Sequence, residues 1–306
     1  MKIIHRMSQD THTKKGLVHL KLHFIVIILG FSAVLGKLIS IDAVGLVLFR
    51  TLTAVISMIL FGILLKKHSM FNRKALIAGS WVGLLLAAHW ITFFHAIKVS
   101  NVSVTLGCLG ASTLFAAFFE PLTDRKKVSP IDIIAGLVII AGIYMIFKFE
   151  FRYIEGIIYS VISAILAAMF SVFNKHLALK HNFKAIALSE LIVACVATCI
   201  FIFAIHGSPT HYLSILQTDD ILWLLILGSI GTAYAYTATI SIIQKLNAYA
   251  VILAINLEPV YGILLARWIF GESEIMTAGF YVGASVILLT VVLYSFKNSF
   301  KKQKKI

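Results

Sequence analysis

Charged residues are scarce in this chain. Only 13% of its 306 residues are Asp, Glu, Lys or Arg, whereas 60% are hydrophobic, and a soluble domain cannot bury so much apolar surface. Proline is scarce too: of four prolines, Pro259 alone interrupts a long apolar run. These shortages exclude a soluble enzyme and indicate a chain that lies mostly within a membrane.

Cysteine is also rare, and its positions exclude a disulfide framework. Cys108, Cys195 and Cys199 all fall inside apolar runs. Cys195 and Cys199 share a helix face at a spacing of four, but no third ligand lies nearby in the sequence for a metal ion. We interpret the three cysteines as small packing residues, and we expect neither a metal nor another cofactor.

Long apolar runs dominate what remains. A bilayer core about 30 Å thick needs roughly 20 apolar residues for each helical crossing. Ten runs of about this size predict an all-α integral membrane protein with ten transmembrane helices, flanked by basic tails at 1–21 and 297–306. The ten runs are residues 22–38, 45–65, 75–97, 102–120, 131–147, 155–174, 185–205, 221–243, 248–270 and 275–296.

The basic residues are distributed unevenly between the two sides of such a bundle. The net charge of +14 would suit a nucleic-acid-binding protein, but the positions of the charges argue against that function. With the N-terminus inside, 21 of the 27 Lys and Arg residues fall in inner segments, five fall in outer ones, and Arg50 lies within an apolar run. This positive-inside pattern predicts a multi-pass protein of the cytoplasmic (inner) membrane with both termini in the cytoplasm. The tails are expected to contact anionic lipid headgroups.

The two halves of the chain are weakly similar. The segment ending at Asn101 aligns with the one ending at Asn247, and Gly79-Ser80 pairs with Gly228-Ser229 if a gap of three is allowed. Because five is odd, a second five-helix unit starts on the opposite side of the membrane. We therefore predict two inverted five-helix repeats, at 22–147 and 155–296, which is the usual architecture for alternating access.

Residues 247–272 read NAYAVILAINLEPVYGILLARWIFGE, with a Pro in the middle of an apolar stretch that ends in Gly-Glu. With the five-plus-five plan and Arg50 early in the second apolar run, this segment resembles EamA-type members of the drug/metabolite transporter superfamily. The first half departs from the pattern, because Ser112-Thr113 stands opposite Glu258-Pro259. The resemblance implies transport, often export, of amino acids or related metabolites, by proton exchange or by facilitated diffusion.

Glu258 is the strongest candidate for a functional residue. An ionisable residue inside a membrane is expensive and is a functional hypothesis by default, and Glu258 lies roughly 15 Å into its predicted helix, near the midplane. Pro259 cannot donate a backbone hydrogen bond, so a kink is expected there. Asn256 is a further candidate, but it lies about 200° away from Glu258 on an ideal helix and reaches the same cavity only if the kink turns both together.

The other candidate residues have alternative structural roles. His89, with Trp90 and Phe93 beside it, either contacts substrate or relays protons, or else it bonds a backbone carbonyl. Tyr234 belongs to a polar row that lines a cavity or bonds neighbouring helices. Arg50 either extends to the headgroups or has a fixed structural partner, while Glu120 and Glu190 are expected near inner helix ends.

We therefore expect a secondary transporter of a small metabolite such as an amino acid, with export favoured and protons as a candidate coupling ion. The rival hypothesis is a membrane-embedded enzyme acting on a lipid or lipid-linked substrate. The sequence has no HExxH, GxSxG or P-loop motif and no pair of intramembrane aspartates, so we favour a protein that is not an enzyme. The oligomeric state is left open.

The charge asymmetry makes a prediction about orientation. In a background without the three native cysteines, a single cysteine in loop 206–220 is expected to react with an impermeant reagent from outside. Single cysteines in loops 66–74 and 125–127 are expected to react only from the cytoplasmic side, because these loops are rich in basic residues. Labelling of both sets from one side would contradict the predicted inversion.

Overall fold

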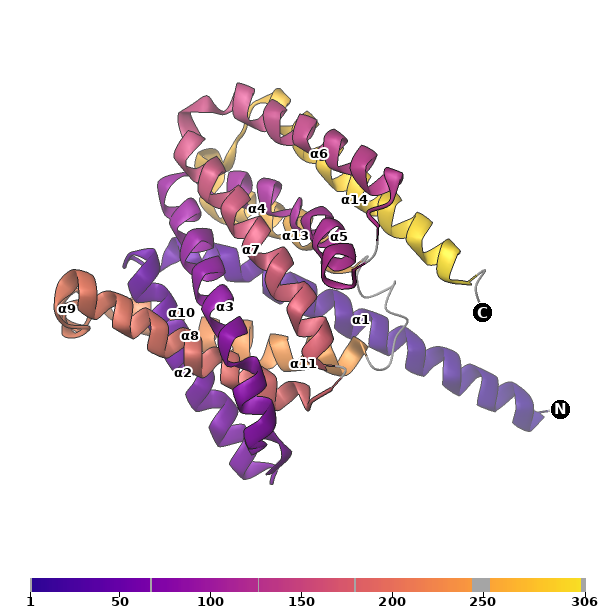
Figure 1. The fold of residues 1–306 in the computed structure, drawn as a ribbon, viewed down its shortest axis with the longest axis horizontal. Coiled ribbons are helices and arrows are strands. Elements are labelled where there is room, and N and C mark those ends of the chain that lie inside the picture. The colour runs from indigo at the N-terminus through magenta and orange to yellow at the C-terminus, as the bar shows by residue number, and fades with distance from the viewer. Residues whose placement is uncertain (1, 67, 126, 179, 244–253, 304–306) are drawn as a thin grey trace.

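The computed structural model describes residues 2–66, 68–125, 127–178, 180–243 and 254–303, and all of its regular elements there are helices. Figure 1 shows their arrangement. The elements are α1 (Lys2–Leu38), α2 (Ala43–Leu64), η1 (His68–Phe71), α3 (Arg73–Val99), α4 (Val102–Leu109), α5 (Ser112–Thr123), α6 (Pro130–Phe149), η2 (Phe151–Tyr153), α7 (Ile154–Ala178), α8 (Phe183–His206), α9 (Thr210–Ile215), α10 (Thr218–Gly228), η3 (Ser229–Tyr234), α11 (Ala235–Ile243), α13 (Glu258–Phe270), η4 (Gly271–Glu274) and α14 (Ala278–Gln303).

Several helices begin where a polar side chain can accept the free amides of the first turn. Asp42 accepts from Val44 N at 2.9 Å at the start of α2, and Asn101 accepts from Val104 N at 2.8 Å at the start of α4. Asn72 and Asn182 do the same for α3 and α8. These caps explain why the apolar helices start at these residues.

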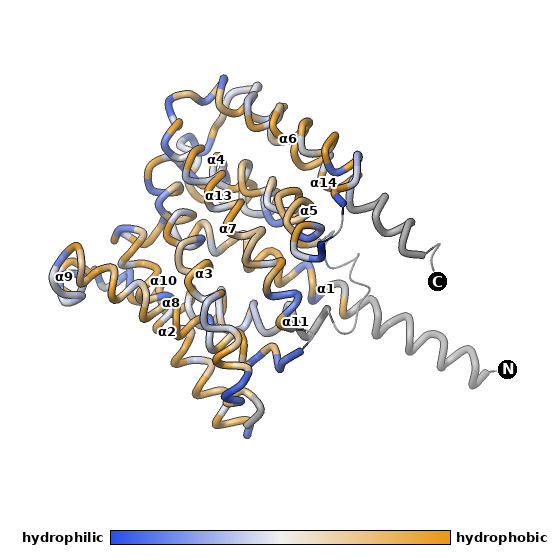
Figure 2. Tube along the Cα trace, in the orientation of Figure 1, coloured by the Kyte–Doolittle hydropathy of each residue, from blue (hydrophilic) through white to orange (hydrophobic). Residues whose placement is uncertain are grey.

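Eight helical segments in the described part of the chain are long and apolar enough to cross a membrane. Figure 2 shows that these segments are mostly hydrophobic and that hydrophilic residues gather where they end. Of the other two predicted crossings, the apolar part of α14 spans Ala278–Tyr294, and α13 follows residues 244–253, which lie outside the described residues. Ten crossings therefore remain a prediction.

The structure adds detail inside the predicted segments. The run 102–120 consists of two helices, α4 and α5, which are separated by a turn at Gly110 and Ala111 and together form one candidate membrane span. The run 221–243 contains the π-helical segment η3. The tails predicted at 1–21 and 297–306 are continuous with long helices, since α1 begins at Lys2 and α14 extends to Gln303. Apolar length alone gives no signal for such breaks and extensions.

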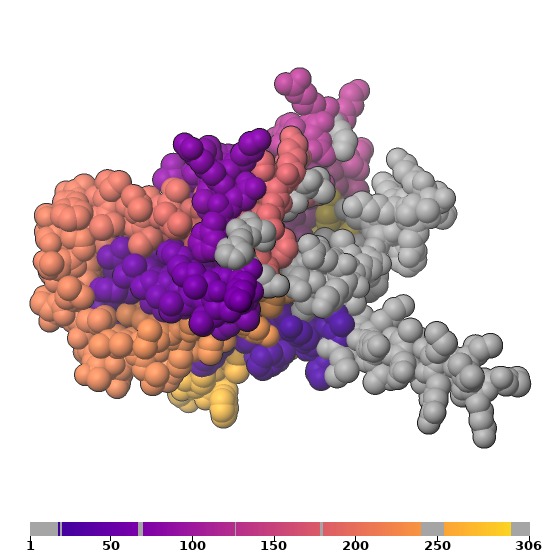
Figure 3. Space-filling view, turned by 90° about the horizontal axis from the view of Figure 1, so that it is seen from below, coloured from indigo at the N-terminus to yellow at the C-terminus, as the bar shows by residue number. Residues whose placement is uncertain are grey.

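The two halves of the chain form one interleaved bundle. Helix α3 packs against α7 and α8, α2 packs against α8 and α10, and α1 packs against α13. In Figure 3 the purple segments of the first half lie between salmon and orange segments of the second half. Helices α6 and α14 run side by side along one edge of the bundle (Figure 1). The surface between the halves is therefore where a shared site can form.

Two glycine contacts show how the halves correspond. A Cβ added to Gly83 on α3 would meet the backbone of Glu190 and the side chain of Val193 on α8, at 2.7 and 2.8 Å. A Cβ added to Gly228 would meet the Arg50 carbonyl and the Thr53 side chain on α2, at 2.9 and 2.5 Å. Arg50 and Glu190 are each the eighth residue of their helix, so these contacts pair Gly228 with Gly83. Gly79 instead meets Ile186 and Ser189, about one turn earlier on α8.

This pairing also accounts for the register of the repeats. The equivalent glycines are 145 positions apart, whereas Asn101 and Asn247 are 146 apart in the sequence. The π-helical segment Ser229–Tyr234 follows Gly228, and one π turn holds one residue more than an α turn. The extra residue therefore lies in η3, and no three-residue gap is needed.

The contact between α6 and α14 also depends on glycine. A Cβ added to Gly283 would lie 2.8 Å from the Gly142 carbonyl oxygen and 3.0 Å from Ile146. We expect Gly283→Ala to lower the free energy of unfolding by about 1–3 kcal/mol, because the two backbones must separate. The measurement is thermal unfolding of the purified protein in detergent.

Gly110→Ala is the matched control, because its nearest neighbours would be 3.5 Å from the new methyl group. It should be neutral or slightly stabilising, since alanine generally has the higher helix propensity. Equal melting temperatures for the two variants would contradict close packing of α6 on α14.

Candidate functional site

Two helices are interrupted near the middle of the bundle. Between α4 and α5, Ala111 N bonds to Cys108 O at 3.1 Å and Leu114 N bonds to Ala111 O at 3.0 Å. Before α13, Leu257 N bonds to Ala254 O at 3.0 Å. These bonds span three residues instead of the four of an α-helix. A turn at Asn256 and Leu257 thus comes just before Pro259, where the sequence predicts a kink.

The two breaks lie against each other. The Thr113 hydroxyl donates to the Asn256 side-chain oxygen at 2.9 Å, and a Cβ at Gly110 would lie 3.8 Å from Pro259. Thr113 is the second residue of α5, and Asn256 precedes α13 by two residues. The amino-terminal ends of both half-helices therefore meet at one level, which concentrates their positive dipole ends there.

A cavity of about 290 Å³ opens beside these breaks. Glu258 and Asn256 both line it, because the turn at Asn256 and Leu257 replaces the ideal helix on which they would point apart. Most of the other lining residues are apolar, with Ser112, Thr113 and Ser285 among the polar exceptions. A mostly apolar cavity with a few converging polar groups is typical of a small-molecule site.

Glu258 is half-buried, and in the described part of the chain its carboxylate accepts no recorded hydrogen bond. Among the described residues, Arg50 carries the opposite charge that acts on Glu258, and the two side chains form no ion pair. A carboxylate on the wall of an apolar cavity with no bonded partner is available to a cationic ligand or to a proton.

Arg50 is held by three other side chains. Its guanidinium lies 4.0 Å from the centre of the Trp90 ring and 5.2 Å from that of Phe94, and its Nε donates to the Thr232 hydroxyl at 2.8 Å. Thr232 lies in the π turn, and its hydroxyl bonds back to the carbonyl of Leu227, five residues earlier. Arg50 is only 5% exposed, so its guanidinium lies against these three side chains within the bundle.

The remaining predicted site residues lie apart from the cavity. His89 Nδ1 lies 3.0 Å from the Ser163 carbonyl oxygen and 2.8 Å from its hydroxyl on α7, as the structural interpretation expects. Phe93 is buried in the core against Phe94. Tyr234 is 40% exposed on the surface of the bundle. Of the predicted set, the structure brings Glu258, Asn256 and Pro259 together at the cavity. The charge of Arg50 acts on Glu258, but neither Arg50 nor Trp90 lines the cavity.

Glu190 is a fully buried acid whose environment the sequence did not reveal. It is 0% exposed, and its Oε2 accepts from the Tyr236 hydroxyl at 2.8 Å and from the Asn174 amide at 3.3 Å. Its position in the helix is a signal that could have found it: Glu190 is the eighth residue of α8, as Arg50 is the eighth residue of α2.

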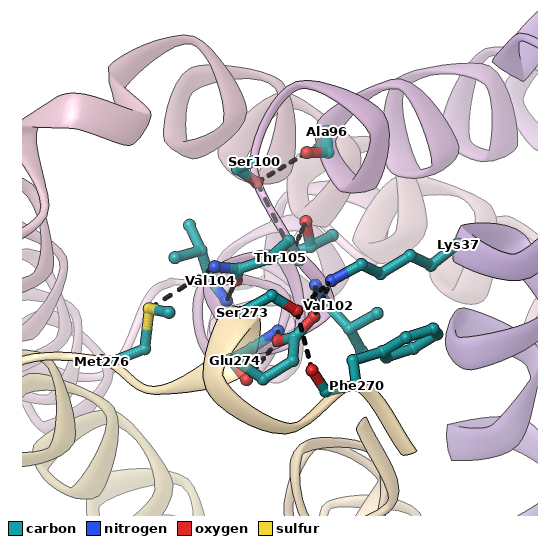
Figure 4. A network of polar contacts seen from close by, with 12 residues as sticks. Lys37, Ala96, Ser100, Val102, Val104, Thr105, Phe270, Ser273, Glu274 and Met276 are labelled. Atoms are coloured by element: carbon teal, nitrogen blue, oxygen red, sulfur yellow. Dashed lines mark hydrogen bonds and ion pairs between the residues drawn. The ribbon is translucent and has the colours of Figure 1, made fainter. Parts of the chain in front are cut away.

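One end of the bundle is closed by a hydrogen-bonded network around Glu274, which we call the Glu274 end (Figure 4). Glu274 is 0% exposed; it accepts from Lys37 Nζ at 2.8 Å and from the amides of Val102 and Ser103 at 3.1 and 2.9 Å. The loop after α13 is thereby tied to α1 and to the start of α4. At the opposite end, Lys175 pairs with Glu120 and His176 with Asp124.

The family model described as "EamA-like transporter family" matches the chain twice, at residues 19–148 and 154–296. The chain belongs to the EamA-like transporter family. This EamA-like protein is therefore a multi-pass membrane transporter of the drug/metabolite type, with a two-repeat architecture and a small-molecule substrate.

Comparison with solved structures supports the fold. One solved structure, titled "Crystal structure of protein", superposes with a TM-score of 0.60 at 14% identity, and the match covers 90% of this chain and 96% of that chain. At this identity the likeness shows the fold alone. No curated protein matches the chain.

The packing of Arg50 makes a prediction about stability. Arg50→Lys keeps the positive charge but loses the planar group over Trp90 and the Nε donor to Thr232, so we expect a loss of about 2 kcal/mol in the free energy of unfolding. Arg152→Lys is the matched control, because Arg152 lies 4.7 Å from the Tyr153 ring centre but is 61% exposed. If the two substitutions shift the melting temperature in detergent equally, Arg50 has no special structural role.

Proposed function

We propose that this protein is a secondary transporter that exports a small metabolite of the amino acid class across the cytoplasmic membrane by alternating access. The observation that carries the proposal is Glu258, a carboxylate without a recorded hydrogen bond on the wall of the central cavity, at the point where two broken helices meet. Discontinuous helices that meet near the midplane are a recurring feature of substrate sites in secondary transporters.

The charges around the cavity suit a zwitterion. Glu258 can pair with an ammonium group, and the guanidinium of Arg50, held over Trp90 and close enough to Glu258 for the two charges to attract each other, can attract a carboxylate. The amino-terminal ends of α5 and α13 add further positive potential for that carboxylate. The small volume and the apolar walls favour a ligand with a short aliphatic side chain.

The two ends of the bundle support an assignment of the sides. The Glu274 end carries few basic residues and, in our assignment, faces outside, whereas the end with Lys175 and Arg125 faces the cytoplasm. The buried network at the Glu274 end would then be the outer gate, and the more exposed Glu120–Lys175 pair would belong to the inner one. Both termini lie inside, where the basic tails can contact anionic lipids.

The test of this function is transport in liposomes. Purified protein is reconstituted, and a panel of labelled amino acids and related metabolites is screened for counterflow with and without an imposed proton gradient. We expect saturable exchange of at least one amine-bearing solute. The proposal would be overturned if no member of the panel showed counterflow although a thermal-unfolding measurement showed the protein in the vesicles to be folded.

Glu258→Gln separates the possible roles of the carboxylate. If Glu258 pairs with an ammonium group, the Gln variant is expected to lose binding by about tenfold to a hundredfold at every pH, because a charge-assisted hydrogen bond is replaced by a neutral one. If Glu258 instead carries a proton, the variant should still exchange substrate but no longer respond to a pH gradient.

Glu155→Gln is the matched control, since Glu155 is 60% exposed and lies beside His95 at the edge of the bundle. It should transport like the unmodified protein. Normal transport by Glu258→Gln, together with a lower melting temperature, would assign Glu258 a structural role and contradict the proposed site.

A further inference from the structure

Glu190 is bonded through only one of its two oxygens. Both recorded donors, the Tyr236 hydroxyl and the Asn174 amide, point to Oε2. Oε1 is fully buried and has no hydrogen-bond partner in the part of the chain that the structure describes. An ionised carboxylate spreads its charge over both oxygens and normally recruits donors to each, so this one-sided pattern does not fit a carboxylate anion.

No described cation compensates a charge on Glu190. The charged and titratable groups on the surrounding helices have other partners. Arg50 on α2 contacts Trp90 and Thr232, and His89 on α3 contacts Ser163. On α7, Lys175 pairs with Glu120 and His176 pairs with Asp124. Arg73 and Lys74 lie exposed at the start of α3, Lys184 lies in the first turn of α8, and Tyr236 on α11 is the titratable group in contact. None of these cations forms an ion pair with Glu190.

A protonated acid does fit the geometry. In a neutral carboxyl group one oxygen is a carbonyl that accepts two hydrogen bonds, and the other carries the proton. Oε2, with its two donors, matches the carbonyl, and Oε1 matches the hydroxyl. The hydroxyl has no acceptor among the described residues either, but burying an unpaired neutral O–H group costs far less than burying an unpaired anion. We propose that Glu190 is a proton-binding site of this transporter, with the proton carried on Oε1.

The position of Glu190 gives the bound proton a role. Glu190 and Arg50 occupy equivalent places in the two repeats. Gly83 of the first repeat packs on Glu190 of the second, and Gly228 of the second repeat packs on Arg50 of the first. Both residues therefore lie on the surface between the halves, which must rearrange in alternating access. When Glu190 releases the proton to water, a carboxylate without a counter-ion is left buried. The protonated form therefore favours tight packing of α8 against the other half, and the ionised form favours separation of α8 from it.

This inference deepens the proposed function by separating two tasks: Glu258 would meet the substrate and Glu190 would carry the proton. The proton site itself needs no substrate to be observed. Its test therefore stands even if the liposome screen fails, and its failure leaves the transport proposal intact.

The experiment is infrared spectroscopy of the whole protein in nanodiscs, recorded as difference spectra while the bulk pH is raised from acid to alkaline. The probe is the proton itself, and the readout is the C=O stretch of a protonated carboxylic acid. We expect a band that is present at neutral pH, is lost in Glu190→Gln and persists in Glu258→Gln.

Tyr236→Phe gives a readout that a merely structural role would not move. It removes one donor to Oε2, so the same band is expected to shift to higher frequency. Tyr212→Phe is the matched control, because Tyr212 donates to Asp42 at 2.8 Å near the Glu274 end and should leave the band in place.

Either of two results would overturn the proposal: spectra of Glu190→Gln that match those of the unmodified protein at every pH, or a band that does not move in Tyr236→Phe. If Glu190→Gln does not fold, the Tyr236→Phe result decides alone.

Discussion

No water reaches the interior of a lipid bilayer, so every polar group placed there must find its partner within the chain. This constraint explains where the few polar side chains of the bundle lie. Arg50 is covered by Trp90 and bonded to Thr232, and the free amides at the start of α4 are taken up by Glu274. Among the described residues there are two exceptions: Oε1 of Glu190, which is buried without a hydrogen-bond partner, and the carboxylate of Glu258, which lies on the wall of the cavity. In our proposal, Glu258 is the one that meets a ligand.

The same constraint limits where the chain can bend. A break in a transmembrane helix leaves backbone groups without hydrogen-bond partners unless neighbouring residues supply them. Here the two breaks lie together, joined by the hydrogen bond from the Thr113 hydroxyl to the Asn256 side chain. Each irregular turn comes directly before a helix, α5 or α13. Helix α4 is held at its own start by Glu274.

Much of the fold could be predicted from the sequence, because apolar length and the positions of basic residues follow directly from the thickness and sidedness of a membrane. Glu258 and Pro259 could be found because a charge and a proline stand out in an apolar run. The break between α4 and α5 could not, since Gly110-Ala111 offers no proline. The environment of Glu190 depends on Asn174 and Tyr236, which come from two other helices and become neighbours only through packing. His89 could be read two ways until its contact with Ser163 was known.

The π turn in η3 adjusts the rotational phase of the helix that contains it. Thr232 lies inside this turn and contacts Arg50, whereas Tyr236 lies just beyond it and contacts Glu190. One residue fewer there would rotate everything after it by about 100°, which would leave Thr232 beside Arg50 but carry Tyr236 away from Glu190. A single inserted residue thus sets the angle between two side chains with different partners, Thr232 with the base Arg50 and Tyr236 with the acid Glu190. Since the first half has no such insertion, the two repeats can share one backbone plan and still present different chemistry to the space between them.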